Sequence, residues 1–409
     1  MKDYLTAQEA ADELGITPAT LYAYVSRGLI RSEAAGDDPR ARRYHAEDVR
    51  RLKARKAARR NPDAAAESAL HLGAPVLESA ITLIEGGRLY YRGYDAVELA
   101  AQRDPEQVAA LIWTGDLSGS VPGLMEAYAL PPRCRAVRER LNGLSLFEIF
   151  QVMLPLAAAD DLAAYDLRPT AVMQAGARIL RLMVALAAGM QPVEGGLAET
   201  LARAWCPDDP GAARLIGAAL ILCADHELNV SAFTARCAAS AGSTPYAAVM
   251  AGLAALQGTR HGGHTERVEA FLREAGSPEG VEAAMAGRLR RGERIPGFGH
   301  PLYPSGDPRG AALLRWVMEA RPAAPVSALA AALVEAGQRL IGEHPTVDTG
   351  LVILCRALEL PAGSPLALFA TGRTIGWIGH IIEQYTLDRM IRPRARYVGA
   401  RPAPPDAEG

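Results

Sequence analysis

Cysteine is scarce in this chain, and its spacing excludes two classes of small domain. Five cysteines are spread over 409 residues, at positions 134, 206, 223, 237 and 355, and no two of them form a C-x-x-C pair. Disulfide-stapled secreted domains and zinc knuckles both need closely spaced cysteines. We therefore expect reduced thiols, no structural metal and a cytoplasmic protein.

We expect neither a leader peptide nor a membrane span, and the net charge is small. The N-terminal stretch MKDYLTAQEAADELG carries acidic residues where a secretory signal needs an apolar core. No apolar run reaches about 18 residues without a charge or a helix breaker, so the sequence predicts no membrane span. The formal net charge of −2 gives no global attraction to nucleic acid.

The charge is nevertheless distributed unevenly. Residues 1–60 contain 13 Lys and Arg against 9 Asp and Glu, a net of +4, whereas the remainder contains 31 against 37, a net of −6. The length favours two or three domains, and 49% hydrophobic residues suffice for a sizeable core. The pattern predicts a basic appendage on an acidic body.

Two short helix signals follow one another near the N-terminus. Thr6 opens a capping box with the segment AQEAADEL, and Gly15 suits the left-handed position that ends this helix. Thr17 and Pro18 supply an N-cap and an N1 proline for a second helix that ends at Gly28. Two short strands and a third helix, which runs into RRLKARKAARR, are expected next.

This arrangement resembles the winged helix-turn-helix of MerR-type and excisionase-type proteins, through LTAQEAADELGITPATLYAYVSRGLI and RRYHAEDV. The resemblance implies a DNA-binding domain at residues 1–60 with PATLYAYVSRG as its recognition helix. Arg27, Arg31, Arg42 and Arg43 are then candidates for phosphate contacts. The alternative is an appendage that serves dimer contacts or has no present function.

The rest of the chain is predicted to be mainly helical. Residues 61–74, which begin with NPDAAAES, are interpreted as a linker, and helical periodicity dominates from about residue 75 to residue 398. The segment ITLIEGGRLYYRG is the best candidate for a β-hairpin. The Pro-rich tail, residues 400–409, is expected to be disordered.

Five stretches place His, Arg or Asp where a helical core would need apolar residues. They are ADHELNVSAFTAR (224–236), LQGTRHGGHTE (256–266), IPGFGHPLYPSGDPR (295–309), PTVDTGLVILCRAL (345–358) and ATGRTIGWIGH (370–380). Taken singly, each has an ordinary explanation, such as a surface loop, a capped surface histidine or a solvated arginine. The HGGH turn could be half of a metal site, but zinc needs further ligands, and we predict no metal.

The spacing of glycines around Arg373 indicates a different environment. Gly372, Gly376 and Gly379 recur along one helix and favour close helix packing. Burial makes an isolated arginine costly, so Arg373 is expected to await an anion.

Taken together, the five stretches match one family. From about residue 78 to residue 399 the chain resembles a citrate synthase, through GGRLYYRGYDAVELA, DHELNVSAFTAR, HGG, GFGH followed by GDPR, VD, GRTIGW and RPRARYVG in this order. The resemblance implies a mainly α, two-domain fold, with a large domain at 75–262 and 349–399 and a small domain at 263–348. It also implies a homodimer with shared active sites, in which Arg392 comes from the partner subunit.

The resemblance further implies the roles of individual side chains. Asp348 is the base that takes a proton from acetyl-CoA, His261 bonds to the thioester oxygen, and His300 acts on the keto oxygen of oxaloacetate. Arg309 and Arg373 grip the two carboxylates. His226 is a further donor to oxaloacetate. Glycines in the loop around His300 are interpreted as allowing the backbone to approach this ligand. No cofactor is implied beyond acetyl-CoA as co-substrate.

Three positions depart from the family's usual pattern, and they leave undecided which acyl-CoA is the substrate. His264 and Thr265 stand where the family most often has Ala and Asn, and Pro301 stands where many bacterial members have a basic residue. The function indicated is citrate synthesis at the entry of the tricarboxylic acid cycle. A 2-methylcitrate synthase acting on propionyl-CoA is the nearest alternative. A non-catalytic regulator that senses acyl-CoA and binds DNA is another, although a pure sensor needs no base at Asp348.

Overall fold

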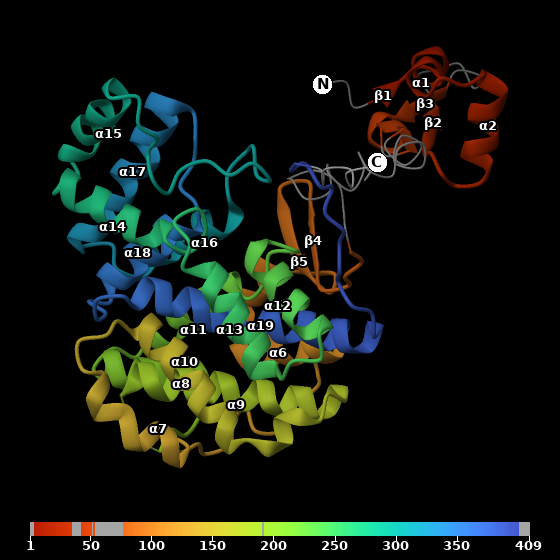
Figure 1. Cartoon of the computed structure of the whole chain (residues 1–409). Coiled ribbons are helices and arrows are strands. Elements are labelled where there is room, and N and C mark those ends of the chain that lie inside the picture. The colour runs from red at the N-terminus through yellow and green to blue at the C-terminus, as the bar shows by residue number, and fades with distance from the viewer. Residues whose placement is uncertain (1–3, 35–41, 51, 54–76, 190–191, 401–409) are drawn as a thin grey trace, which may run out of the picture. The chain divides into compact units, whose positions relative to one another are not determined.

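The structure is a computed structural model that describes residues 4–34, 42–50, 52–53, 77–189 and 192–400. The chain divides into two compact units, residues 1–78 and 79–409, called here the head and the body. The predicted linker at 61–74 and nearly all of the predicted tail lie outside the described residues. Both units are shown in Figure 1.

The head has the predicted helix-turn-helix with a small sheet. Its helices are α1 (Ala7–Leu14) and α2 (Pro18–Ser26), and its sheet has the order β1 (Tyr4–Leu5), β3 (Arg42–His45), β2 (Ser32–Ala34) with antiparallel pairs.

The local signals that predicted these elements are confirmed. The Thr6 hydroxyl accepts from the backbone N–H of α1 in a capping box, and Gly15 ends α1 at φ 59°. Thr17 caps α2, and Gly28, at φ 70°, lies just past its end. Residues 46–50 and 52–53 are helical, as expected for the third helix.

The body begins with the predicted hairpin. Strand β4 (Thr82–Glu85) pairs antiparallel with β5 (Arg88–Tyr91), and Gly86 and Gly87 form the turn at φ 60° and 75°. Two successive positive φ values are those of a type I′ turn, one of the two common two-residue hairpin turns. The sequence did not indicate the short third strand, β6 (Tyr94–Asp95), which pairs with β5.

The remainder of the body is helical, which confirms the predicted fold class. Its α-helices are α5 (Ala96–Gln102), α6 (Pro105–Thr114), α7 (Pro132–Val137), α8 (Leu146–Asp160), α9 (Pro169–Ala188), α10 (Leu197–Trp205), α11 (Ala212–Cys223), α12 (Val230–Ser240), α13 (Pro245–Leu256), α14 (His264–Ala275), α15 (Gly280–Arg290), α16 (Pro308–Ala320), α17 (Pro325–Ile341), α18 (Val347–Ala357) and α19 (Ser364–Leu387). Two 3₁₀ turns, η1 (Arg138–Leu141) and η2 (Leu162–Tyr165), accompany them.

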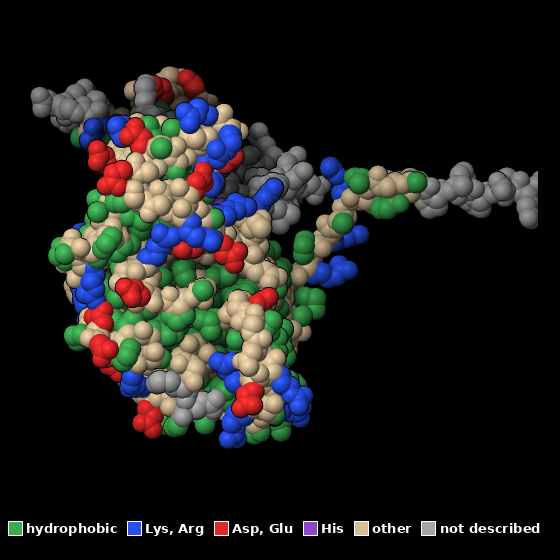
Figure 2. Space-filling model, turned by 90° about the vertical axis from the view of Figure 1, so that its left-hand side faces the viewer, with side chains coloured by type: hydrophobic (Ala, Val, Ile, Leu, Met, Phe, Trp, Pro, Cys, Tyr) green, Lys and Arg blue, Asp and Glu red, His purple; other side chains and the backbone are tan. Residues whose placement is uncertain are grey.

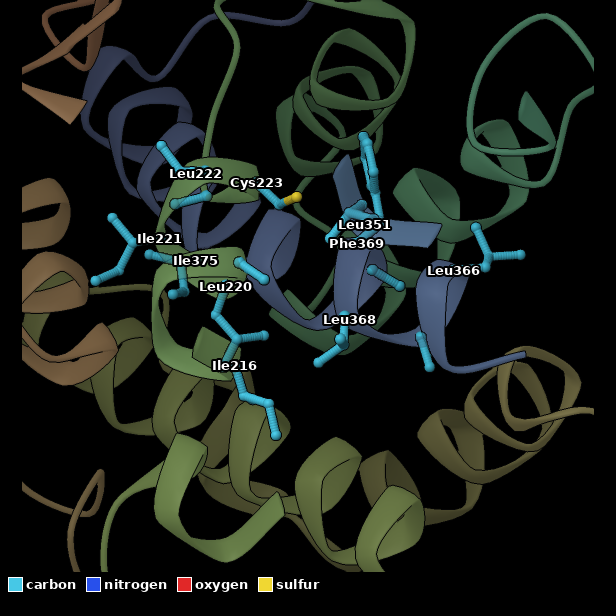
Figure 3. Close-up of a cluster of buried hydrophobic side chains, with 14 of the residues drawn as sticks. Ile216, Leu220, Ile221, Leu222, Cys223, Leu351, Leu366, Leu368, Phe369 and Ile375 are labelled. Atoms are coloured by element: carbon cyan, nitrogen blue, oxygen red, sulfur yellow. The ribbon is translucent and has the colours of Figure 1, made fainter. Parts of the chain in front are cut away.

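Helix α19 lies in the core of the body, where α11 packs against it (Figure 3). A Cβ at Gly372 would lie 2.5 Å from the Leu220 carbonyl oxygen, and one at Gly376 would collide with the Ala224 carbonyl oxygen. The glycines therefore allow the two helix backbones to touch. This confirms the predicted close packing and leaves Arg373 only 1% exposed.

Helices α14 to α18 form a group of their own within the body (Figure 1). Helix α18 contacts both α14 and α16, and α15 contacts α17. The group spans much of the stretch predicted as a small domain, 263–348, but the boundaries between large and small domains stay a prediction.

Helix α9 is long and apolar enough, by length and composition, to cross a membrane, and no other described helix meets that test. Within the fold, however, 67% of its apolar window is buried. Burial of this kind is that of a core helix, and one of its two arginines, Arg181, is itself fully buried.

After α19 the chain leaves the helices as an extended segment, residues 388–400 (Figure 2). We call it the C-terminal arm. Its apolar side chains are among the most exposed in the protein, with Met390 at 67%, Tyr397 at 67% and Val398 at 86%.

Candidate active site

One cavity of about 600 Å³ in the body is lined by six of the seven residues predicted for catalysis and substrate binding. They come from five separate stretches of the chain: His226, His261, His300, Arg309, Asp348 and Arg373. The seventh, Arg392, lies on the exposed C-terminal arm and does not line this cavity. The fold thus brings together residues up to 147 positions apart, from 226 to 373.

His226 lies in the turn between α11 and α12 and is buried. Its Nε2 lies 2.9 Å from the Tyr303 hydroxyl, a partner that the sequence did not indicate. Burial lowers the pKa of His226 well below its ordinary value, and the nearby positive charge of Arg309 lowers it further. The imidazole is therefore neutral at pH 7.

Arg309 is fixed by a carboxylate two residues before it. Its Nε and Nη2 each donate to Asp307 at 2.9 Å, and Asp307 also accepts from the Val347 backbone N–H at 3.0 Å. Burial alone would lower the pKa of Arg309, but Asp307 raises it above the ordinary range. The guanidinium, 3% exposed, is a permanent cation with a set direction.

Arg373 lies on α19 and is fixed by a backbone carbonyl instead. Its Nε donates to the Cys223 carbonyl oxygen at 2.8 Å, and its Cζ lies 4.8 Å from the centroid of the Phe369 ring. Burial lowers its pKa, which is the expected direction for a cation without a carboxylate in direct contact. A bound anion would offset the desolvation cost of the buried Arg373 guanidinium.

The loop that carries His300 contains no helix or strand between α15 and α16, because prolines and glycines recur through residues 295–309. The Leu302 backbone N–H donates to His300 Nδ1 at 3.2 Å, so a neutral imidazole here carries its proton on Nε2. Burial lowers the pKa of His300 to about 4, and Arg309 contributes in the same direction. His300 can therefore donate one hydrogen bond at neutral pH.

The glycines of this loop have a packing role that the sequence did not reveal. Gly297 and Gly299 have φ values of 77° and 71°. A Cβ at Gly297 would collide with Thr349 of α18, and one at Gly299 would lie 2.6 Å from the Glu343 carboxylate. The glycines thus allow the loop to pack on the turn before α18 and on that helix.

His261 lies between α13 and α14 and faces a hydroxyl on α12. Its Nε2 is 2.8 Å from the Ser231 hydroxyl, which also contacts Asn229 Oδ1 at 2.8 Å and accepts from Trp377 Nε1 at 3.2 Å. Because Ser231 has a single proton, it can donate to only one of His261 and Asn229. Burial lowers the pKa of His261 to about 4, so this histidine is also neutral.

Asp348 lies in the first turn of α18, and its carboxylate accepts from the Thr346 hydroxyl at 3.3 Å. Burial raises the pKa of Asp348, although the charges of His264 and Arg309 oppose this shift. A carboxylate with a raised pKa is a stronger base than a solvated one.

Three further arginines line the cavity and were not predicted: Arg260, Arg267 and Arg294. All three are exposed, and among the described residues none of them has a carboxylate partner. With Arg309 and Arg373 they make five guanidinium groups around one carboxylate, Asp348. The cavity is therefore built for an anionic ligand.

The three residues that depart from the expected pattern lie in different environments. His264, the first residue of α14, and Pro301 both line the cavity. Thr265 does not; its side chain is 1% exposed and donates to the Gly262 carbonyl oxygen at 3.2 Å.

The four arginines predicted to contact DNA have unequal surroundings in the head. The guanidinium of Arg31 binds both oxygens of Asp48, which is 1% exposed, at 2.9 and 3.2 Å. Arg43 pairs with Glu33, and Arg42 donates to the Ser32 carbonyl oxygen. Arg27, the C-cap of α2, is exposed. Arg31 therefore helps to hold the head together.

Two family models match the chain. The one described as citrate synthase, C-terminal domain, matches residues 71–394, and the one described as helix-turn-helix domain matches residues 4–57. Citrate synthase 2 of Bacillus subtilis is 29% identical over 80% of this chain and 94% of its own length.

Solved structures agree in fold. Citrate synthase from Thermotoga maritima superposes with a TM-score of 0.69 at 28% identity, over 81% of this chain and 96% of its own. The enzyme from Thermoplasma acidophilum, solved as a ternary complex with carboxymethyl coenzyme A and oxaloacetate, gives a TM-score of 0.68 at 26% identity, over 81% and 97%.

Proposed function

The chain belongs to the citrate synthase family, and from this premise we propose that it condenses acetyl-CoA with oxaloacetate and hydrolyses the resulting thioester to citrate and CoA. The observation that carries the proposal is the single cavity in which three neutral histidines, one carboxylate and two fixed arginines meet. Such a set matches a reaction that needs a base, electrophiles and a clamp for a dianion.

Oxaloacetate is held as a dianion between Arg309 and Arg373. Each guanidinium uses part of its donors on protein oxygen atoms and keeps others for a ligand carboxylate. His226 adds a donor or acceptor at the same end, and Tyr303 holds its imidazole in place.

Enolisation occurs between Asp348 and His261. The Asp348 carboxylate takes a proton from the acetyl methyl group while His261 bonds to the thioester oxygen as negative charge develops there. This role requires an imidazole proton on Nδ1, so Nε2 of His261 must accept from the Ser231 hydroxyl, whose single proton then turns from Asn229 Oδ1 to His261.

Condensation forms one carbon–carbon bond. The enol carbon attacks the keto carbon of oxaloacetate, and His300, which carries its proton on Nε2, donates to the keto oxygen as that oxygen becomes an alkoxide. Water then attacks the thioester carbonyl of citryl-CoA, and the C–S bond breaks to give citrate and the free thiol of CoA.

The three exposed arginines of the cavity suit the phosphate groups of CoA. Arg260, Arg267 and Arg294 lie on the wall with His261 and His300 and offer positive charge that the dicarboxylate does not need.

A homodimer with shared sites completes the proposal. Arg392 lies on the C-terminal arm, whose apolar side chains are largely exposed in the single chain (Figure 2). A second copy would cover them, and it would bring Arg392 to the neighbouring cavity as a third cation for the substrate.

The head is proposed to bind DNA. The matched helix-turn-helix family and the exposed Arg27 and Arg42 support this role. The recognition helix α2 also exposes Tyr22, at 55%.

One assay separates the candidate functions: thiol release from acetyl-CoA and from propionyl-CoA, each with and without oxaloacetate. A citrate synthase releases thiol fastest from acetyl-CoA and only with oxaloacetate present. Faster release from propionyl-CoA would assign the chain to 2-methylcitrate synthesis. Binding of both ligands without any release would make it a regulator that senses acyl-CoA.

A further inference from the structure

A buried network of ionisable side chains lies next to His226 and has no part in the proposed chemistry. His380, on α19, is fully buried, and its Nε2 lies 3.1 Å from Asp225 Oδ1. Asp225 is also fully buried and precedes His226 in the chain. Burying a carboxylate and an imidazole costs desolvation free energy, which suggests that this pair has a specific role in the fold.

Asp225 is fixed from several sides. The Thr82 hydroxyl of β4 donates to its Oδ2 at 2.5 Å, and Tyr91 of β5 bonds to its backbone N–H and carbonyl oxygen at 3.3 and 3.2 Å. Burial alone would raise the pKa of Asp225, but His380 holds it below the ordinary value. These bonds determine the position of the turn that presents His226 to the cavity.

The other nitrogen of His380 points along α19. Its Nδ1 has no hydrogen-bond partner, and the nearby Glu383 carboxylate lies 3.9 Å away, beyond bonding distance. Glu383 binds Arg236 at 3.0 Å and accepts from the Ala80 backbone N–H at 2.9 Å.

The same end of α19 also holds the beginning of the C-terminal arm. Gln384 accepts from Arg236 Nε at 3.1 Å and donates to the Arg389 carbonyl oxygen at 2.7 Å. The Ile391 backbone N–H donates to Ser240 of α12 at 3.1 Å. These bonds hold the start of the arm that carries Arg392 beside the end of α19.

We propose that Asp225 and His380 are positioning residues for oxaloacetate: their hydrogen bond holds the turn at 224–229, and so His226, at the distance from Arg309 and Arg373 that the dicarboxylate needs. This proposal rests on the proposed function. It assigns a purpose to a buried pair that touches neither substrate.

The test compares two replacements of His380 in the full chain. Gln can place an amide N–H where Nε2 lies and so keep the donor to Asp225, whereas Asn is too short to reach it. We expect His380→Asn to weaken oxaloacetate binding by about tenfold, as for a lost hydrogen bond to a buried carboxylate, and His380→Gln to restore most of the affinity. Isothermal titration with oxaloacetate measures this directly, and the KM for oxaloacetate should rise while kcat changes less.

Two further variants guard against a simple folding defect. Thr82→Val removes the other side-chain bond to Asp225 with little change in shape and should weaken binding in the same direction but less. Trp113→Phe is the matched control. It removes a buried hydrogen bond of 2.8 Å to the Ile375 carbonyl oxygen of α19, and this bond is not part of the network around Asp225 and His380. It should lower the melting temperature and leave oxaloacetate affinity unchanged.

Three results would overturn the inference. They are unchanged affinity in folded His380→Asn and Thr82→Val, equal losses in His380→Asn and His380→Gln, or an equal loss in Trp113→Phe. Wild-type protein that does not bind oxaloacetate at all would instead overturn the proposed function together with this inference.

Discussion

Arginine serves two different purposes in the cavity of the body and on the surface of the head. In the cavity, Arg309 and Arg373 are 3% and 1% exposed, and each is fixed from behind by a protein oxygen. In the head, Arg27 and Arg42 are exposed side chains on the end of α2 and on β3.

The difference follows from what each surface would bind. A small dianion is recognised by hydrogen bonds of fixed direction, so the guanidinium groups must be ordered before it arrives. Because they are buried, their side-chain entropy is already lost during folding and not on binding. A polyanion with a repeating backbone needs local positive charge more than direction, and exposed, mobile side chains suffice. Mutation of a cavity arginine should therefore have a large effect on ligand binding and salt a small one. In the head, mutation of one arginine should have a small effect on DNA binding and salt a large one.

Removing the proposed base should have the largest effect on activity, and it should separate catalysis from oxaloacetate binding. We expect Asp348→Ala to lower thiol release by about a thousandfold or more, because the carboxylate acts as base in the transition state. Oxaloacetate affinity should change little, since Arg309 and Arg373 remain. Assays of thiol release and calorimetric titration of the same protein check both statements.

Arg373→Lys is the matched control for that experiment. An ammonium cannot reproduce the bond to the Cys223 carbonyl and a ligand carboxylate together, so oxaloacetate binding should fall first. If Asp348→Ala kept near-normal turnover, Asp348 would not be the base.

Arg392 allows a sharper comparison, because it is exposed like the head arginines but proposed to act like the buried ones. Arg392→Ala and Asp348→Ala chains should each be nearly inactive alone. When they are mixed and exchanged, about a quarter of the sites should regain both residues if Arg392 comes from the partner subunit. Activity that stays absent after confirmed subunit exchange would exclude a site shared in this way.

The pH dependence of kcat tests the electrostatics of the cavity. Burial lowers the pKa of His261 and of His300 to about 4, and it raises that of Asp348 above its ordinary 3.8. As the pH falls, protonation of Asp348 removes the base, so the acid loss of activity should occur at a higher pH than an ordinary aspartate would give. The pH profile of Asp348→Glu should shift, whereas His300→Gln should lower kcat without moving the acid limb. An acid limb that moves with His300 would contradict the assignment.

Local signals in the sequence predicted local structure well. The caps at Thr6 and Thr17 and the Gly86–Gly87 turn each depend on residues a few positions apart. Such features are set by backbone geometry, which neighbouring residues determine.

Pairings between distant residues were not predictable in the same way. Nothing near Arg31 announces its bond to Asp48, 17 positions later, or near Asp225 its bond to His380, 155 positions later. The cavity arginines Arg260, Arg267 and Arg294 were missed because surface positions of helices and turns tolerate arginine anywhere. Only the assembled fold tells which of them face one ligand.

Variants of His264 and Thr265 test whether a residue must line the cavity to affect the choice of acyl-CoA substrate. His264 faces the cavity and its charge acts on both His261 and Asp348, whereas Thr265 is buried against the backbone. His264→Ala should enlarge the acyl end and raise the ratio of propionyl-CoA to acetyl-CoA turnover about tenfold, within the range of one methylene. Thr265→Ala should leave the ratio unchanged, and equal ratios in both variants would remove His264 from specificity.

The smallest effect is expected in the head, where exposed charge should act weakly and additively. If the head binds DNA, its affinity should fall steeply as salt rises, because phosphate contacts release counterions. Arg42→Ala with Arg43→Ala should weaken binding at low salt and reduce the salt slope by about one unit per lost contact. Arg31→Ala should instead destabilise the head, since it leaves the buried Asp48 without its guanidinium. Anisotropy titrations of the full chain on promoter and random duplexes, beside thermal melts, separate the two outcomes, and condensation activity should be unchanged in both variants. Micromolar protein that binds neither duplex would leave the head without a DNA-binding role.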